Sequence, residues 1–325
     1  IEPYEENLSI RFRIDGILKE KLNPSSRIAP LLNARIKVMS NLDIAERRIP
    51  QDGRMSLKLG EKWVDIRVST LPSSFGERLV LRLLDKADAS LDLEELGMTS
   101  EMTKDYLQQL KSTSGIILVT GPTGSGKTTT LYSGLNFLND QTRNILTVED
   151  PIEYALEGVG QTQVNNKVGL SFSKGLRAIL RQDPDVVMVG EIRDKETAET
   201  AIQASLTGHL VLSTIHTNDS VGAITRLIDM GVEPYLLAST LKMVIAQRLV
   251  RKLINKNEFS GRVGIFEMIK IDSEIKNYIN ETVDEDKIRK IAFKKYNSLL
   301  NDGEEKVKKG ITSELEIKRV LKQVD

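Results

Sequence analysis

The sequence predicts an α/β protein in which a domain with a mostly parallel sheet follows a smaller α+β domain. In the second part of the chain, short apolar runs alternate with helical stretches, which is typical of a buried parallel sheet with helices on both faces. In the first part, Gly, Pro and Ser separate short strand-like runs from one helical stretch. The chain has 325 residues, enough for about two such domains.

Residues 1–95 are predicted to form the smaller domain and the start of a linker. Apolar and arginine side chains alternate over Ile10–Ile14, which indicates a strand, and Asp15 and Gly16 supply a hairpin turn. A helix is predicted over Arg27–Met39. Further strands are predicted at Arg54–Leu59, Trp63–Ser69 and Arg78–Leu84. The polar stretch Asp85–Glu101 is interpreted as the linker, with an ordinary surface loop as the alternative.

Residues 96–325 are predicted to form the larger domain. Its strands are expected at Ile116–Val119, Asn144–Val148, Val186–Val189 and Leu210–Ser213. Its helices are expected at Thr128–Asn136, Gly175–Arg181 and Glu196–Ser205. From about Glu233 onward the chain is predicted to be mainly helical to its end, with charged amphipathic segments such as Asp284–Tyr296 and Glu304–Lys309.

Composition argues against several classes of function. Lys and Arg number 46, as do Asp and Glu, so no bulk field attracts nucleic acid or an anionic membrane. Aromatic residues make up only 5%, few for a protein that stacks on bases. No apolar run approaches the roughly 18 residues that span a bilayer, so no direct membrane insertion is expected. The absence of cysteine excludes disulfides and thiolate metal sites and is compatible with the cytoplasm.

A glycine-rich loop separates the apolar run Ile116–Val119 from the next helical stretch. It comprises Gly121, Pro122, Thr123, Gly124, Ser125, Gly126, Lys127 and Thr128, and Thr129 follows. Glycines let backbone N–H groups point inward around phosphates. Lysine at this place reaches the β- and γ-phosphates, the threonine hydroxyl binds Mg²⁺, and the helix dipole favours the anion. We therefore predict that the chain binds ATP with Mg²⁺ and hydrolyses it. A glycine-rich turn with a solvated lysine is the alternative.

The predicted strand Val186–Val189 leads into Gly190 and Glu191. We expect this strand to lie next to the one that precedes the glycine-rich loop. Enzymes with such a loop usually have aspartate at the place of Gly190, so water or another acid has to complete the magnesium shell. We interpret Glu191 as the catalytic carboxylate that orients or deprotonates the attacking water. A surface carboxylate at the strand end is the alternative.

Two further acids follow the strand Asn144–Val148. Glu149 and Asp150 stand at its carboxyl end, where ligands gather in an open α/β sheet. They are predicted to bind Mg²⁺ or its waters. Capping of the strand end before Pro151 is the alternative.

Both histidines of the chain flank the strand Leu210–Ser213. His216 follows it among polar residues and is interpreted as a sensor of the γ-phosphate. His209 precedes it and should lie at the opposite end of the sheet. A structural role is the alternative for each. Zinc is not expected, because the chain has only two histidines and no cysteine.

Together these segments resemble the type II secretion and type IV pilus assembly ATPases, a branch of the secretion ATPase superfamily. The matching segments are Arg47–Arg54, Val64–Asp85, Gly121–Thr128, Ile145–Tyr154, Arg181–Asp194 and Ser213–Thr217. They cover nearly the whole chain in a highly specific order. Gly190 in place of aspartate is itself a feature of this family.

The resemblance implies a RecA-like P-loop NTPase domain that a flexible linker joins to a preceding PAS-like domain. It also implies homohexamers that bind nucleotide in the cleft between the two domains. Family members supply arginines from the smaller domain to the phosphates, and Arg67 and Arg82 match those positions. Each also interrupts an apolar strand, which costs stability unless the charge is used. Solvated arginines on the strand face are the alternative.

By this resemblance, ATP hydrolysis powers assembly of a type II secretion pseudopilus or a type IV pilus. The motor would be a cytoplasmic hexamer that acts on inner-membrane platform proteins, with no nucleic acid as partner. A pilus retraction ATPase of the same superfamily is one alternative. A nucleic-acid translocase or DNA-uptake motor is another.

Two departures from the family pattern stand out. Members of this branch usually carry a four-cysteine zinc module after the segment that corresponds to Gln247–Arg251, and no cysteine occurs here, so no zinc is expected. The chain also begins with Ile1, so we expect that the family's platform-docking domain is missing upstream. The missing cysteines favour the retraction alternative, whereas Arg47–Arg54 and Pro72–Arg78 favour assembly.

Overall fold

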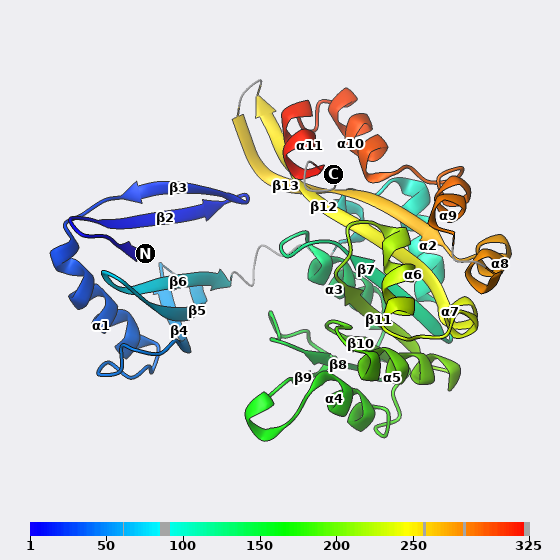
Figure 1. Ribbon diagram of the computed structural model, residues 1–325, viewed down its shortest axis with the longest axis horizontal. Coiled ribbons are helices and arrows are strands. Elements are labelled where there is room, and N and C mark those ends of the chain that lie inside the picture. The colour runs from blue at the N-terminus through cyan, green and yellow to red at the C-terminus, as the bar shows by residue number, and fades with distance from the viewer. Residues whose placement is uncertain (61, 85–91, 256–257, 282–283, 322–325) are drawn as a thin grey trace. The chain divides into compact units, whose positions relative to one another are not determined.

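The computed structural model describes residues 1–60, 62–84, 92–255, 258–281 and 284–321 (Figure 1). The chain divides into two compact units, Ile1–Ala89 and Ser90–Asp325. The linker expected at Asp85–Glu101 is too long at its C-terminal end. Its residues 85–91 lie outside the described residues. Leu93–Leu96 form a short 3-10 helix, η2, whose leucines are buried in the core of the second unit. A polar sequence with two buried leucines therefore belongs to that unit.

The first unit contains two antiparallel sheets and one long helix. One sheet has the order β1 (Glu2–Pro3), β2 (Leu8–Ile14), β3 (Ile17–Leu22), and the other β4 (Gln51–Leu59), β5 (Lys62–Ser73), β6 (Gly76–Leu84). Helix α1 (Ala29–Met39) follows the 3-10 helix η1 (Ser26–Ile28). Asp15 and Gly16 turn the β2–β3 hairpin with φ values of 48° and 83°, as the Asp-Gly pair predicts. The core consists of Ile36, Met55, Ile66, Val68 and Leu79.

The second unit is built on a seven-stranded sheet with the order β13-β12-β7-β11-β10-β8-β9. Its strands are β7 (Gly115–Thr120), β8 (Ile145–Glu149), β9 (Gly160–Gln163), β10 (Val186–Val189), β11 (Leu210–Ile215), β12 (Leu241–Asn255) and β13 (Glu258–Lys270). Neighbouring strands pair in parallel except β12 and β13, which are antiparallel. The predicted α/β class with a mostly parallel sheet is confirmed.

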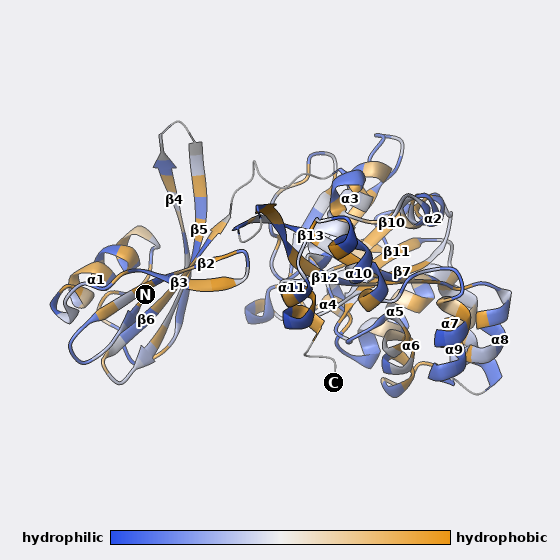
Figure 2. Cartoon of the chain, turned by 90° about the horizontal axis from the view of Figure 1, so that it is seen from above, coloured by the Kyte–Doolittle hydropathy of each residue, from blue (hydrophilic) through white to orange (hydrophobic). Residues whose placement is uncertain are grey.

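Helices cover both faces of this sheet (Figure 1). They are α2 (Ser100–Leu110), α3 (Lys127–Leu138), α4 (Phe172–Ile179), α5 (Lys195–Leu206), α6 (Ser220–Asp229), α7 (Pro234–Thr240), α8 (Ser273–Glu281), α9 (Glu285–Ala292), α10 (Leu299–Lys308) and α11 (Glu314–Leu321), with a 3-10 turn η3 (Asn166–Val168). Ile116 and Leu118 of β7 join the core under α4–α9, while Ile117 and Val119 join the core under α2 and α3. Figure 2 shows the hydrophobic strands at the centre of this unit and more hydrophilic residues on the outer helices.

The prediction that the chain is mainly helical beyond Glu233 is wrong for Leu241–Lys270. This segment forms the long hairpin of β12 and β13. Most of its central residues are buried on both faces, so polar and apolar residues do not alternate as they do in a half-buried strand. Leu, Lys and Arg, which recur in β12, also favour helices intrinsically, and the tertiary environment overrides that preference.

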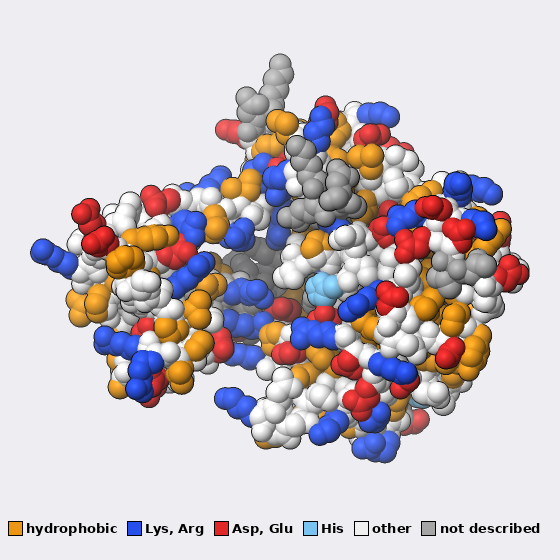
Figure 3. Space-filling model, viewed as in Figure 1, with side chains coloured by type: hydrophobic (Ala, Val, Ile, Leu, Met, Phe, Trp, Pro, Cys, Tyr) orange, Lys and Arg blue, Asp and Glu red, His pale blue; other side chains and the backbone are white. Residues whose placement is uncertain are grey.

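Two surface properties bear on function. On the face shown in Figure 3, acidic and basic side chains are interspersed over the second unit. Among the described residues, no helix is both long enough and apolar enough to cross a membrane.

Candidate P-loop site

The glycine-rich loop, called the P-loop from here on, connects β7 to α3. Gly121, Gly124 and Gly126 have φ values of 144°, 81° and 88°, a region that side chains with a Cβ rarely adopt. Gly126 caps helix α3, which begins at Lys127. Pro122, Thr123 and Gly124 are exposed, and so is Thr128, whereas Ser125 is buried. Thr129 lies in the first turn of the helix. This arrangement of strand, loop and helix N-terminus fits a phosphate chain.

The amino group of Lys127 is held at the start of the P-loop. Its Nζ donates hydrogen bonds to the carbonyl oxygens of Gly121 at 2.7 Å and Pro122 at 3.2 Å. Burial lowers the pKa of Lys127 to about 8, and the positive charge of Arg248 lowers it further, while the negative charge of Glu191 opposes both. A phosphate group would restore the charged form of this lysine.

Glu191 lies between the side chains of Arg193 and His216. Its Oε1 is 3.1 Å from Nε2 of His216, and its Oε2 accepts a hydrogen bond from Nε of Arg193 at 2.6 Å. Its side chain is only 14% exposed, whereas that of His216 is 44% exposed. The hydroxyl of Thr214 donates to the carbonyl oxygen of Gly190 at 2.7 Å, which joins the two strand ends. The structure therefore brings together Glu191 and His216, which the sequence analysis interpreted separately.

The expected position of β10 is wrong. Strand β11 lies between β7 and β10, so Val186–Val189 is not adjacent to the P-loop strand. Strand order depends on pairings between distant segments, and the apolar pattern of a strand does not encode its neighbours. Gly190 has a clear packing reason: a Cβ there would lie 3.3 Å from Cα of Glu149 and 3.3 Å from the carbonyl oxygen of Val148.

Glu149 is enclosed by protein donors. Its Oε1 accepts hydrogen bonds from Thr147 at 2.6 Å and Gln161 at 3.0 Å, and its Oε2 accepts one from the hydroxyl of Tyr132. Asp150 next to it is exposed. Within the described ranges, no group of three or more His, Asp or Glu side chains is arranged to hold a metal ion. A role for Glu149 or Asp150 in binding Mg²⁺ stays a prediction, and the Glu149 carboxylate would have to give up protein donors for direct ligation.

His209 lies at the start of β11, at the end of that strand opposite to His216. Its Nδ1 is 2.9 Å from the carbonyl oxygen of Ala204 and 3.1 Å from the hydroxyl of Thr207. Ala204 lies in the last turn of α5 and Thr207 caps that helix, so this histidine ties the start of β11 to the end of α5.

Arg67 and Arg82 belong to the first unit and are direct partners across β5 and β6. Arg54 on β4 is the partner of Arg67 on its other side. Because partners in a ladder share a face, the three arginines form a row across this sheet. Arg67 is half-buried, and Arg54 and Arg82 are exposed.

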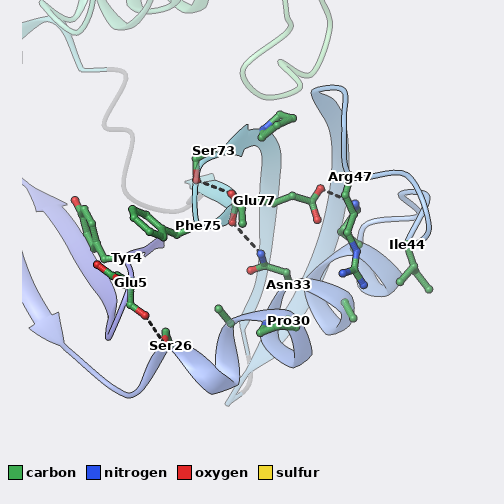
Figure 4. Close-up of a pocket in the computed structure, with 15 residues that line it drawn as sticks. Tyr4, Glu5, Ser26, Pro30, Asn33, Ile44, Arg47, Ser73, Phe75 and Glu77 are labelled. Carbon is green, nitrogen blue, oxygen red and sulfur yellow. Dashed lines mark hydrogen bonds and ion pairs between the residues drawn. The ribbon is translucent and has the colours of Figure 1, made fainter.

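A cavity of about 290 Å³ in the first unit contains none of the predicted site residues (Figure 4). The side chains of Asn33, Lys37 and Glu77 that line it are buried. Nζ of Lys37 lies 2.6 Å from Oε1 of Glu77, and Nδ2 of Asn33 donates to the main-chain oxygen of Glu77 at 2.8 Å. This internally satisfied pair fixes α1 on β6.

The sequence analysis missed Gln247 and Arg248, which lie against the P-loop. A Cβ on Gly121 would be 2.5 Å from the carbonyl oxygen of Gln247, and a Cβ on Gly126 would be 2.7 Å from its Nε2. The hydroxyl of Thr130 donates to Oε1 of Gln247 at 2.7 Å. The sequence feature that could have indicated them is the position of two polar residues directly after the apolar run Met243–Ala246. Because this segment was interpreted as helical, that feature was not read as a strand end.

Comparison with known proteins identifies the family. A family model described as "Type II/IV secretion system protein" matches residues 1–321. The chain belongs to this family. Type II secretion system protein E of Pseudomonas aeruginosa is 52% identical over 359 aligned positions, which cover 99% of this chain and 72% of that protein. Type II secretion system ATPase E of Vibrio cholerae is also 52% identical, with 99% of this chain and 71% of that protein covered.

Solved structures of secretion ATPases share the fold of this Type II/IV secretion system protein. The pilus retraction motor PilT with bound ADP is 28% identical, with a TM-score of 0.70 over 97% of this chain and 90% of that one. The Legionella pneumophila ATPase DotB has a TM-score of 0.76 at 24% identity, over 96% of this chain and 90% of that one.

The alignment with the Pseudomonas protein bears on the zinc module that the sequence analysis expects to be missing from this chain. It spans 359 positions, more than the 325 residues of this chain, so the relative has residues inside the aligned region that this chain lacks. In this chain, β12 ends at Asn255 and β13 begins at Glu258, and the two residues between them lie outside the described part.

Proposed function

We propose that this chain is the ATP-hydrolysing motor subunit that powers assembly of a type II secretion pseudopilus. The observation that carries this proposal is the meeting of the P-loop, Glu191 and His216 at one edge of a parallel sheet. The names of similar proteins support the proposal, since two relatives at 52% identity are named type II secretion system proteins. Assembly of a type IV pilus is the nearest variant of the same function.

Each site residue has a role that follows from its position. The P-loop N–H groups and Lys127 bind the phosphates, and Thr128 at the start of α3 would hold Mg²⁺. Bound Mg²⁺ supplies charge neutralisation of the β- and γ-phosphate oxygens. Glu191 would orient the attacking water and accept its proton, and His216, 3.1 Å from Glu191, would sense the γ-phosphate. Arg193 and His216 fix both oxygens of the carboxylate, so a rearrangement of one of these contacts frees an oxygen for water.

The arginine row of the first unit contains the two positions from which the resembled family supplies arginines to the phosphates. Arg67 and Arg82 would neutralise phosphate charge, a contribution that is worth orders of magnitude in rate in related phosphoryl-transfer enzymes. ATP binding would be coupled to motion, since ATP shifts a conformational equilibrium toward the arrangement that it binds better. We propose that the working form is a cytoplasmic homohexamer that passes this motion to an inner-membrane platform protein.

Pilus retraction is the second candidate, because PilT has the same fold over nearly the whole chain at 28% identity. The higher identity of about 52% to secretion proteins favours assembly over retraction. Complementation of a deletion strain separates the two: restored secretion supports assembly, and restored twitching without secretion supports retraction.

ATPase activity of purified, assembled protein tests the site. Lys127→Ala and Glu191→Gln should each lower kcat by at least about 100-fold. Lys174→Ala and Glu199→Gln are matched controls, because both side chains are exposed in the same unit. Undiminished turnover in both site variants would refute the assignment. For the arginine row, Arg67→Ala should lower kcat more than Arg35→Ala, which removes an exposed arginine from α1.

A further inference from the structure

Arg248 is a buried cation beside the P-loop to which the mechanism above gives no role. Strand β12 runs parallel to β7, and Ala246 is the register partner of Thr120, the last residue of β7. The two residues after Ala246 therefore lie level with the start of the P-loop. The side chain of Arg248 extends from this level, and the residue is only 4% exposed.

The guanidinium of Arg248 lies beside the first glycine of the P-loop. A Cβ on Gly121 would lie 3.2 Å from Nη1 of Arg248, and Nη1 itself donates to the carbonyl oxygen of Gln247 at 3.0 Å. That same carbonyl oxygen is the atom that would lie nearest to a Cβ on Gly121, at 2.5 Å. Arg248 and the carbonyl of Gln247 thus occupy the space next to Gly121 on the side of β12.

The same guanidinium also holds the segment that follows β11. Its Nη2 donates to the carbonyl oxygen of Asn218 at 2.7 Å. The neighbouring Thr217 is fastened to β7, because its N–H donates to Oγ1 of Thr120 at 2.9 Å and the two hydroxyls are 2.7 Å apart. The two residues after His216 are therefore both fixed, one by the P-loop strand and the other by Arg248.

A cation at this place is costly for the fold. Burial lowers the pKa of Arg248, and the negative charges of Glu267 and Asp219 oppose that shift. The hydrogen bonds of Nη1 and Nη2 go to main-chain carbonyls, which compensate a buried charge less well than a carboxylate does. An apolar side chain would fill a buried strand position at lower cost. A guanidinium group holds its N–H donors in a rigid, fork-shaped arrangement. An arginine is therefore favoured at this position if the P-loop and the segment after β11 have to be held in fixed positions.

We propose that Arg248 is a positioning residue of the ATPase site, which holds the Asn218 carbonyl at the P-loop end of β12 so that His216 and Glu191 meet the phosphates on the P-loop. This role, which rests on the proposed ATPase function, is exerted through the two loops and requires no contact with the reacting atoms. Loss of the guanidinium should therefore impair the chemical step more than nucleotide binding, for which the P-loop and Lys127 remain.

Substitutions of Arg248 and a matched arginine test this role. Arg248→Lys keeps the charge, Arg248→Gln keeps a single donor group, and Arg248→Ala leaves space for a guanidinium ion. Arg251→Gln is the control, because Arg251 is on the same strand but pairs with Glu316 and stacks on Phe259 at 4.1 Å. For each variant, kcat and KM for ATP, the Kd of a fluorescent ATP analogue and the midpoint of thermal unfolding are measured.

We expect Arg248→Gln to lower kcat by about 100-fold, the typical effect of misplacing a catalytic group by an ångström, while Kd changes by less than about threefold. Arg248→Lys should be intermediate. Millimolar guanidinium chloride should raise kcat of Arg248→Ala, and sodium chloride at the same ionic strength should not. Arg251→Gln should lower the unfolding midpoint and leave kcat per folded subunit unchanged.

Three results would overturn the role of Arg248: wild-type kcat in folded Arg248→Gln, a change confined to KM and Kd, or a loss of activity that only follows the folded fraction. Lys127→Ala, measured in parallel, reports on the proposed function itself. If that variant keeps its turnover, the ATPase site is wrongly placed. If it is inactive while Arg248→Gln is fully active, only the role of Arg248 fails.

Discussion

Two tyrosines in contact differ in the hydrogen bonds of their hydroxyl groups, which allows the contribution of these bonds to be measured. The rings of Tyr132 and Tyr154 meet edge to face with centroids 4.9 Å apart. The hydroxyl of Tyr132 donates to Oε2 of the buried Glu149. Burial, and then the charge of Glu149, raises the pKa of Tyr132 far above its usual value, so it stays a neutral donor. The hydroxyl of Tyr154 is buried and, within the described part of the chain, has no hydrogen-bond partner.

The change from tyrosine to phenylalanine should therefore have opposite effects at the two positions. A hydrogen bond to a charged group contributes about 1.5–3 kcal/mol. Glu149 keeps two donors, Thr147 and Gln161, after Tyr132→Phe, so we expect a loss of about 2 kcal/mol in the free energy of unfolding. In a unit of this size that corresponds to a midpoint lower by about 4–8 °C. Tyr154→Phe removes a buried unsatisfied hydroxyl and should be neutral or stabilise by up to about 1 kcal/mol.

Two spectroscopic signals separate the effect on the second unit from effects on the first. The single tryptophan of the chain, Trp63, lies in the first unit, so its fluorescence follows that unit during unfolding. Far-UV circular dichroism follows mainly the larger helical second unit. Tyr132→Phe should shift the dichroism transition and leave the Trp63 transition in place. Equal shifts for the two tyrosine variants, or none for Tyr132→Phe, would refute the reasoning.

Three further predictions concern Gly190, Lys37 and Lys127. Gly190→Asp should destabilise more than Gly190→Ala: the methyl costs about 1–3 kcal/mol by overpacking, and a carboxylate next to the buried Glu149 adds repulsion between like charges; equal unfolding midpoints would contradict this. Lys37→Met should cost the first unit about 3–5 kcal/mol, read from Trp63 fluorescence, because Glu77 stays buried without its cation, and Glu77→Gln in the same chain should recover part of the loss. Because the pKa of Lys127 is lowered to about 8, the unligated protein deprotonates there, and the Kd for an ATP analogue should rise about fivefold between pH 8 and pH 9 while that of Lys127→Arg stays flat. A flat profile for the wild type would contradict the role of Lys127.

The P-loop could be predicted from sequence because every position in it has a local requirement. Gly121, Gly124 and Gly126 need positive φ, and Lys127 needs to start a helix after an apolar run. These requirements depend on neighbours within the same short segment, so composition and spacing reveal them. The parallel sheet was predictable for the same reason, since each strand such as Ile116–Val119 is short, apolar and followed by a helix.

The remaining relations depend on contacts between distant segments. The pairing of Glu191 with His216 needs β10 and β11 to be neighbours, and nothing in either strand specifies this. The enclosure of Glu149 depends on Tyr132 of α3 and Gln161 of β9. A carboxylate after an apolar strand looks the same in sequence whether it faces a ligand or a ring of protein donors.

The failure to predict β12 and the failure to find Arg248 have a common physical cause. A strand that is buried on both faces shows no alternation, and its polar residues carry no sign of the direction in which they point. Only the register of Ala246 with Thr120 places Arg248 level with the P-loop. Parallel pairing brings the ends of β7, β11, β10 and β8 to this same edge, where the P-loop, His216, Glu191 and Glu149 follow them. The antiparallel β13 reaches this level as well, because Glu267 is the partner of Ala246, and its buried carboxylate accepts hydrogen bonds from Ser220 of α6 and Leu299 of α10. One level of the sheet therefore carries Arg248 beside the P-loop and, through Glu267, holds the N-termini of these two helices.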